Sequence, residues 1–102
     1  MLFSLSIFPT SKKTASVSED VAQVIDIIDK SGLRYKLTAM STIIEGDWEP
    51  VMRVINKARL KLRRKHERIY MVLTVDDRKG AKGRLVGKVA SIQRRLKREV
   101  CT

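Results

Sequence analysis

Hydrophobic and polar side chains alternate along the first eight residues, which predicts a strand with one buried face. Alternate residues of a pleated chain point to opposite sides. The two rows of side chains are Phe3, Leu5 and Ile7 on one side and Ser4, Ser6 and Phe8 on the other. Pro9 ends the pattern, because proline cannot donate to a strand ladder. Residues 2–8 are therefore expected to form the first strand, half buried.

The hydrophobic period changes from two to that of a helix after the polar run 10–18. Ser16 and Glu19 have the spacing of a capping box and predict the start of a helix. Its apolar face is formed by Val21, Val24, Ile25 and Ile28. Gly32 is a typical residue just beyond a helix end, so the helix is expected to finish near residue 30.

Two short strands are predicted next, over residues 34–40 and 42–46, followed by a second helix. Asp47 is a suitable N-cap, and Pro50 in the first turn fits a helix start. The buried stripe of this helix is predicted to consist of Val51, Val54, Ile55, Ala58 and Leu62.

The segment 68–76 is predicted to be a strand that is apolar on both faces. Its two rows are Ile69, Met71, Leu73 and Val75 on one side and Tyr70 and Val72 on the other. Two apolar faces require cover on both sides, from a helix and from something else such as a partner subunit. After Gly80 and Gly83, a last helix carries the apolar stripe Leu85, Val89, Ile92 and Leu96.

The predicted order is β-α-β-β-α-β followed by a further helix. This is the pattern of an α+β, ferredoxin-like sandwich with an additional C-terminal helix. Two helices would cover one face of the sheet, which leaves the other face for oligomerisation, the last helix or a ligand. The 102 residues suit a single domain, 1–102.

Charge is distributed unevenly along the chain. The net charge is +11, and residues 53–102 carry 17 basic and 4 acidic side chains against 5 and 7 in residues 1–52. This asymmetry raises the alternative of a nucleic-acid partner. The single cysteine, Cys101, cannot form an internal disulfide, and no apolar run approaches the ~20 residues of a membrane helix. We therefore expect a cytoplasmic protein without a membrane partner.

Polar side chains gather around the turn between the two short strands. Hydroxyls, a thioether and a carboxylate in so short a run suit a small polar ring better than a metal ion or a nucleophile. The candidate ligand-binding residues of this hairpin are Thr38, Met40, Ser41, Thr42 and Glu45. Ser4 and Ser6 on the first strand could line the same sheet face. Phe8, Met40 or Trp48 could cover a bound ring.

Three sequence blocks resemble those of the thiamine-binding, YkoF-like family of small ferredoxin-like proteins. The blocks are Leu33-Arg-Tyr-Lys-Leu, Met40-Ser-Thr-Ile-Ile-Glu-Gly-Asp and Val75-Asp-Asp-Arg. The resemblance implies a homodimer or homotetramer that binds thiamine or its hydroxymethylpyrimidine half without catalysis. It places Ser41, Thr42, Glu45 and Asp76 at pocket-forming positions.

Other interpretations of these residues stay open. Glu45 could instead cap the following helix or form an ion pair, and Asp76 could end its strand with a surface ion pair. Adjacent Asp76 and Asp77 lack a third ligand at a suitable spacing, so no metal and no cofactor are expected. His66 lies in a polar connection and is expected at the surface, which leaves no pair of groups for nucleophilic catalysis. A nucleic-acid-binding module and a structural or regulatory oligomer without a small ligand are the alternative functions.

Overall fold

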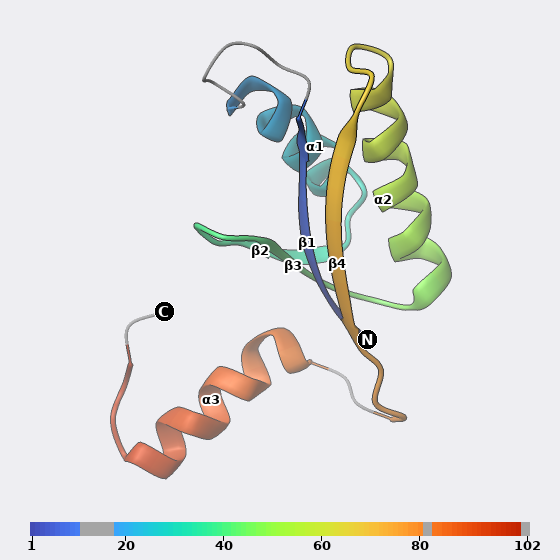
Figure 1. Ribbon diagram of the computed structural model, residues 1–102. Helices are drawn as coiled ribbons and strands as arrows, with labels where there is room; N and C mark the ends of the chain where they lie inside the picture. Colours follow the sequence, from blue (N-terminus) through green and yellow to red (C-terminus); the bar gives the residue numbers. More distant parts are fainter. Residues whose placement is uncertain (11–17, 81–82, 101–102) are drawn as a thin grey trace.

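The computed structural model describes residues 1–10, 18–80 and 83–100. Its elements are β1 (Leu2–Pro9), α1 (Ser18–Lys30), β2 (Arg34–Leu37), β3 (Thr42–Glu45), α2 (Trp48–Arg63), β4 (Ile69–Asp76) and α3 (Arg84–Leu96). The ferredoxin-like order with an added C-terminal helix is confirmed (Figure 1). The expected capping serine, Ser16, lies outside the described residues.

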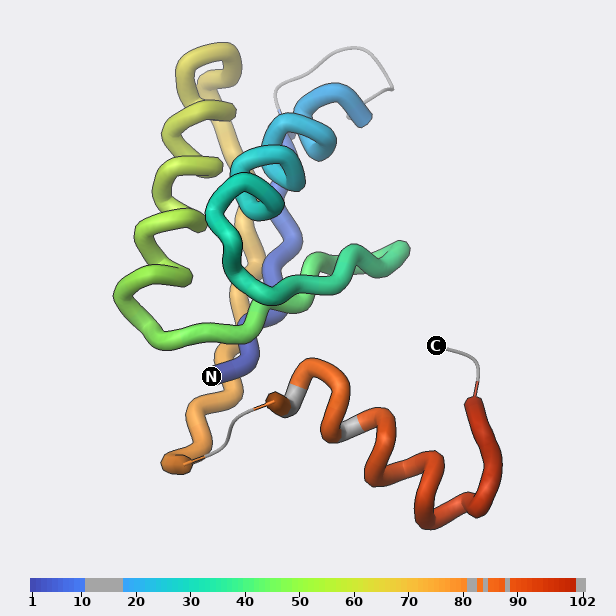
Figure 2. Tube along the Cα trace, turned by 180° about the vertical axis from the view of Figure 1, so that it is seen from behind, coloured from blue at the N-terminus to red at the C-terminus, as the bar shows by residue number. Residues whose placement is uncertain are grey.

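The four strands form one antiparallel sheet in the order β2-β3-β1-β4. Consecutive strands joined by a helix are separated by one strand in this order, as the split β-α-β pattern requires. The helices α1 and α2 pack side by side on one face of the sheet, which Figure 2 shows from the helix side. We call this the covered face and the other the open face.

The covered face carries the core. Register places Phe3 of β1 between Ile44 of β3 and Val75 of β4, so these side chains point toward the helices. The fully buried side chains include Phe3, Leu5, Ile44, Val24, Ile28, Val51, Ile55 and Leu62. Burying one such side chain contributes about 1.5–3 kcal/mol to stability.

The helix α3 lies on the opposite side of the sheet from α1 and α2. Leu85 and Val89 face Leu2, Ile43 and Thr74 across a cavity of about 390 Å³. The end of α3 reaches beyond the sheet (Figure 1), where Ile92 and Leu96 are about half exposed. The helix therefore covers only part of the open face.

The structure changes three details of the sequence expectation. The second strand ends at Leu37 instead of residue 40, because residues 38–41 form a hydrogen-bonded turn. Asp47 occupies the N-cap position of α2 but makes no side-chain capping bond. The expectation of a surface His66 is wrong: only 12% of its side chain is exposed, and its Nε2 lies 3.0 Å from Asp20 Oδ1 of α1.

The expected double cover of β4 is only partly present within one subunit. Helix α2 contacts β4 on the covered face. On the open face, Tyr70 and Val72 remain 49% and 46% exposed.

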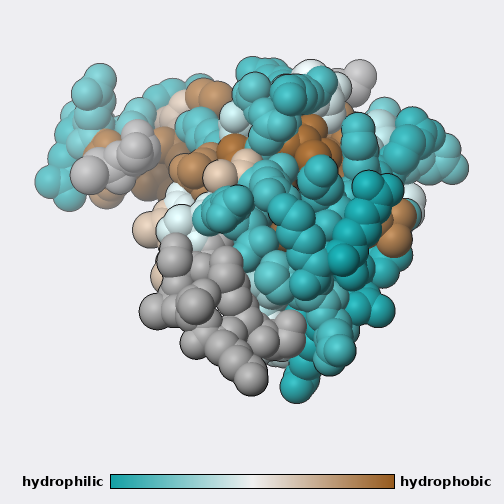
Figure 3. Space-filling model, turned by 90° about the horizontal axis from the view of Figure 1, so that it is seen from above, coloured by the Kyte–Doolittle hydropathy of each residue, from teal (hydrophilic) through white to brown (hydrophobic). Residues whose placement is uncertain are grey.

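Hydrophilic side chains dominate the view from above in Figure 3, with hydrophobic groups showing in patches between them. Across the described ranges, no helix combines the length and apolar character needed to cross a membrane.

Candidate ligand-binding site

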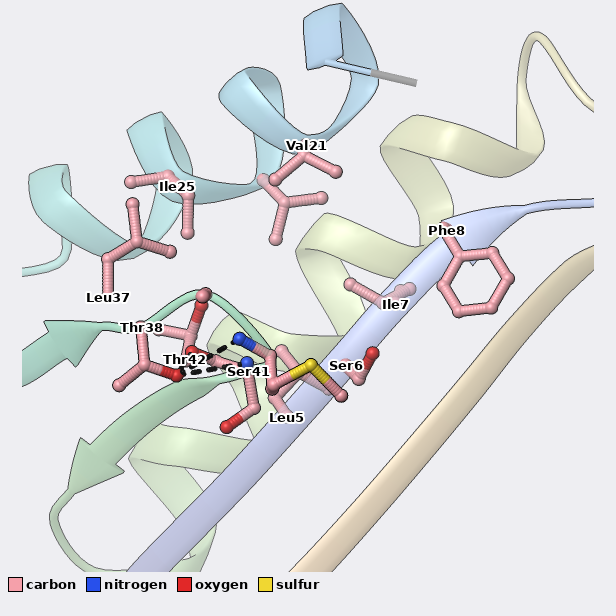
Figure 4. Close-up of a pocket in the computed structure, with 13 residues that line it drawn as sticks. Leu5, Ser6, Ile7, Phe8, Val21, Ile25, Leu37, Thr38, Ser41 and Thr42 are labelled. Carbon is pink, nitrogen blue, oxygen red and sulfur yellow. Dashed lines mark hydrogen bonds between the residues drawn. The ribbon is translucent and has the colours of Figure 1, made fainter. Parts of the chain in front are cut away.

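A cavity of about 190 Å³ lies at the turn between β2 and β3. It opens between this turn, the middle of β1 and the first half of α1 (Figure 4). The residues that line it are Leu5, Ser6, Ile7, Phe8, Val21, Val24, Ile25, Leu37, Thr38, Ala39, Met40, Ser41 and Thr42. Of the residues expected at a site, Ser6, Thr38, Met40, Ser41 and Thr42 meet here. We call this space the turn cavity.

Thr38 organises the turn that forms one wall of this cavity. Its hydroxyl donates to the Ser41 carbonyl at 2.7 Å and accepts from the backbone N–H groups of Ser41 at 3.1 Å and Met40 at 3.4 Å. A threonine hydroxyl has one proton and two lone pairs, so these bonds use its whole capacity. Thr38 therefore fixes the backbone and leaves the polar contacts to neighbouring side chains.

Two serine hydroxyls retain capacity for a ligand. Ser4 Oγ donates to Ser41 Oγ at 3.1 Å, which leaves the Ser41 hydroxyl its own proton and one lone pair. Ser6, the next residue of β1 on the open face, makes no side-chain hydrogen bond within the described ranges. Ser4 and Ser6 thus share a sheet face as the sequence suggested, and Ser41 joins them.

The remaining wall of the turn cavity is apolar. Val21 and Ile25 of α1 and Leu37 of β2 face the space in Figure 4. Met40 is 85% exposed at the turn, whereas Thr42 is 5% exposed and faces the core. Apolar walls with a few hydroxyls at one end are the usual construction of a site for a small aromatic ring.

An acidic groove continues from the turn cavity along the outside of α1 and β2. The two spaces share Val21, Ile25 and Leu37, and the groove adds Asp26 and Asp29. We call it the acidic groove. Both carboxylates are exposed at the surface.

Local hydrogen bonds in the acidic groove shift two ionisable groups. Tyr35 donates to Asp29 Oδ1 at 2.8 Å, and this bond raises the pKa of the Tyr35 phenol. The hydrogen bond and ion pair with Asp26, at 2.9 Å, raise the pKa of Lys30. In both cases the side-chain hydrogen bond to the aspartate is the largest cause of the shift.

Glu45 and Asp76 lie away from the turn cavity. Glu45 is at the far end of β3, opposite Arg34 of β2, and lines a separate cavity with Asp47 and Arg78. Asp76 is opposite Leu2 at the end of β4, beside the cavity under α3. A single subunit therefore brings Asp76 into the same cavity as Ser4, but it places neither carboxylate in the turn cavity. Trp48 is also distant, because it packs against Phe3 with ring centroids 6.0 Å apart.

The α1 wall of the site was not found from the sequence. Val21 and Ile25 are spaced like core residues of an amphipathic helix, and nothing in the pattern separates them from Val24 and Ile28. The pair Asp26 and Asp29 looked like an ordinary solvated helix face. Over residues 1–10, 18–80 and 83–100, no three His, Cys, Asp or Glu side chains gather as a metal site would require.

Comparison with known proteins gives the family of this chain. The family model described as thiamine-binding protein matches residues 3–93, so the chain belongs to the thiamine-binding protein family. A UPF0045 protein of Mycobacterium bovis is 37% identical over 83 residues, which cover 80% of this chain and 81% of that protein.

Solved structures of similar proteins share the fold. A hypothetical protein of Methanocaldococcus jannaschii superposes with a TM-score of 0.81 at 28% identity, covering 89% of this chain and 93% of that one. A Thermotoga maritima protein proposed to act in thiamine biosynthesis or salvage has a TM-score of 0.78 at 21% identity, covering 89% and 96%. The latter likeness shows the fold alone.

Proposed function

We propose that this protein binds thiamine or its hydroxymethylpyrimidine moiety in the turn cavity, as a homo-oligomer and without chemical transformation. Membership of the thiamine-binding protein family supports the ligand class. The observation that carries the proposal is the meeting of Ser6, Ser41 and Met40 with an apolar α1 wall in one small cavity. Hydroxyls both donate and accept, so they complement the amino group and ring nitrogens of an aminopyrimidine.

The size of the turn cavity supports binding of one ring. At about 190 Å³ it is smaller than the ~300–1,000 Å³ typical of sites for drug-sized ligands. The pyrimidine would lie against the Val21–Ile25 wall, with Ser6 and Ser41 at the polar end of the cavity and the Met40 thioether near the ring edge. The second ring of thiamine would then extend outside the cavity.

The acidic groove supports a place for that second ring. Thiazolium carries a permanent positive charge, and the strongly basic second half of the chain would repel it. Asp26 and Asp29 put negative charge in a groove that shares Val21, Ile25 and Leu37 with the turn cavity, and exposed charges interact over ~10 Å at moderate salt. Thiamine is therefore expected to bind more tightly than the neutral pyrimidine alone.

The absence of an assembled acid–base or nucleophilic pair at the turn cavity supports binding without turnover. Within the described residues that line it, the polar groups are serine and threonine hydroxyls, and His66 is engaged with Asp20 elsewhere. Binding would sequester the vitamin or its precursor, or deliver it to another protein.

Calorimetric titration of the full chain with thiamine and with hydroxymethylpyrimidine tests this proposal. We expect saturable binding of both compounds. The double substitution Asp26→Asn and Asp29→Asn should weaken thiamine binding severalfold and leave pyrimidine binding nearly unchanged, because only thiamine carries the positive charge. Glu49→Gln, at an exposed position of α2, is the matched control and should change the affinity for neither compound.

Absence of binding heat with both compounds would overturn the proposal. Equal weakening of both ligands by the double substitution would overturn the placement of the thiazolium ring. Affinity for RNA or DNA that falls steeply with salt, in a protein that binds neither compound, would favour the nucleic-acid alternative instead.

A further inference from the structure

The strand β4 forms an edge of the sheet without the features that usually protect an edge. It has eight residues and contains no proline, glycine or lysine, and its first charged residue is Asp76 at the end. Four of its apolar side chains are 37–49% exposed: Tyr70, Met71, Val72 and Val75. The other edge, β2, has four residues and carries Arg34 and Lys36. A long, apolar and unprotected edge strand is a template for pairing with another strand.

The backbone groups of β4 that point outward can be assigned from one hydrogen bond. Thr10 N donates to Arg68 O at 3.1 Å, in register with the β1–β4 pairing. In an antiparallel ladder, hydrogen-bonded and non-hydrogen-bonded pairs alternate. Even-numbered residues of β4 therefore bond toward β1, and the outward N–H and C=O groups belong to Ile69, Met71, Leu73 and Val75.

Charge favours one register for pairing with a second copy. A twofold axis at Val72 sets Met71 against Leu73 and Ile69 against Val75, so outward groups meet outward groups. This register also sets Arg68 opposite Asp76, a favourable cross-strand pair. Moving the axis to Leu73 keeps the hydrogen bonds but sets Arg68 against Arg78. A twofold axis midway between two residues is excluded, because it would set outward-pointing backbone groups of one strand opposite inward-pointing groups of the other.

We propose that β4 pairs edge to edge with β4 of a second copy of this chain, antiparallel about a twofold axis at Val72. The two four-stranded sheets then form one continuous sheet, and the half-exposed Tyr70 and Val72 gain neighbours across the axis. The inference rests on the homo-oligomer of the proposed function and is independent of its ligand.

A proline substitution tests the backbone pairing. Met71→Pro removes an outward N–H, and proline is tolerated on an edge strand where that group is not bonded within the sheet. Met71→Ala removes the same side chain and keeps the N–H, so it is the matched control. In sedimentation velocity with native circular dichroism as a check of folding, we expect Met71→Pro to raise the dimer dissociation constant by about tenfold or more, and Met71→Ala to change it much less.

A cysteine scan tests the register. In a Cys101→Ser background, Val72→Cys places two thiols on the axis, where Cα atoms of a non-hydrogen-bonded pair are about 4.5 Å apart, within the range for a disulfide. We expect rapid covalent dimers from Val72→Cys under mild oxidation. Tyr70→Cys and Thr74→Cys, each facing a different residue of the partner, should cross-link slowly.

An oligomer that is unaffected by Met71→Pro, or that cross-links no faster through Val72→Cys than through the two flanking variants, would overturn the edge pairing while leaving a homo-oligomer standing. A wild-type protein that sediments as a monomer at every concentration would overturn both. Ligand titration is unaffected by either outcome, so the ligand part of the proposed function is tested separately.

Discussion

At the scale of single residues, the contact between Asp20 and His66 is the clearest case of tertiary structure overriding the local sequence. Both side chains look like surface groups in their own segments, yet they are 5% and 12% exposed and 3.0 Å apart. They are 46 positions apart in the chain, so no local pattern indicates the pair. The contact joins the first turn of α1 to the connection between α2 and β4.

Loss of this contact should destabilise the protein. His66→Ala removes a hydrogen-bond partner of a buried carboxylate, and such a loss costs about 1–3 kcal/mol. We therefore expect the free energy of unfolding, measured by urea denaturation, to fall by that amount. Lys65→Ala, an exposed neighbour, should change it by about 0.5 kcal/mol or less. Equal effects of the two substitutions would show that the contact does not contribute to stability.

At the scale of elements, hydrophobic period and turn residues were sufficient to predict the order of strands and helices. The alternation in β1 and the stripe Val51, Ile55, Leu62 in α2 both appear as buried faces. The end of β2 could not be predicted from period alone, because the alternation continues to Met40. The chain forms a turn after Leu37 instead of continuing the strand, because the Thr38 hydroxyl makes three hydrogen bonds within residues 38–41.

The junction between β3 and α2 depends on a glycine without a side chain. A Cβ at Gly46 would lie 2.8 Å from Val51 Cγ2 and 3.3 Å from Leu33 Cδ2. Since Val51 is fully buried, Gly46→Ala should lower the free energy of unfolding by about 1–3 kcal/mol.

Gly87→Ala is the matched control for this junction. A Cβ at Gly87 in α3 meets no atom within 4 Å, so the same change should leave stability unchanged or raise it by up to about 1 kcal/mol. Chemical denaturation measures both variants. A neutral Gly46→Ala would show that the junction can relax around a methyl group.

At the scale of the whole molecule, the structure brings some of the predicted site residues together and leaves others apart. The hydroxyls near the turn meet in the turn cavity because they are adjacent on a hairpin and on β1. Glu45 does not join them, since β3 carries it about 10 Å along the sheet from Thr42. The wall from α1 was missed because helix-to-hairpin packing depends on how distant segments meet.

Titration of two variants shows whether the turn cavity holds the pyrimidine ring. Ala39→Trp fills the cavity from an exposed turn position, and Glu45→Ala alters the separate charged cavity. Calorimetry with hydroxymethylpyrimidine should give binding at least about tenfold weaker in Ala39→Trp and close to wild type in Glu45→Ala. Full affinity in Ala39→Trp, with loss of binding in Glu45→Ala, would show that the ring does not bind in the turn cavity and would move the site to the far end of β3.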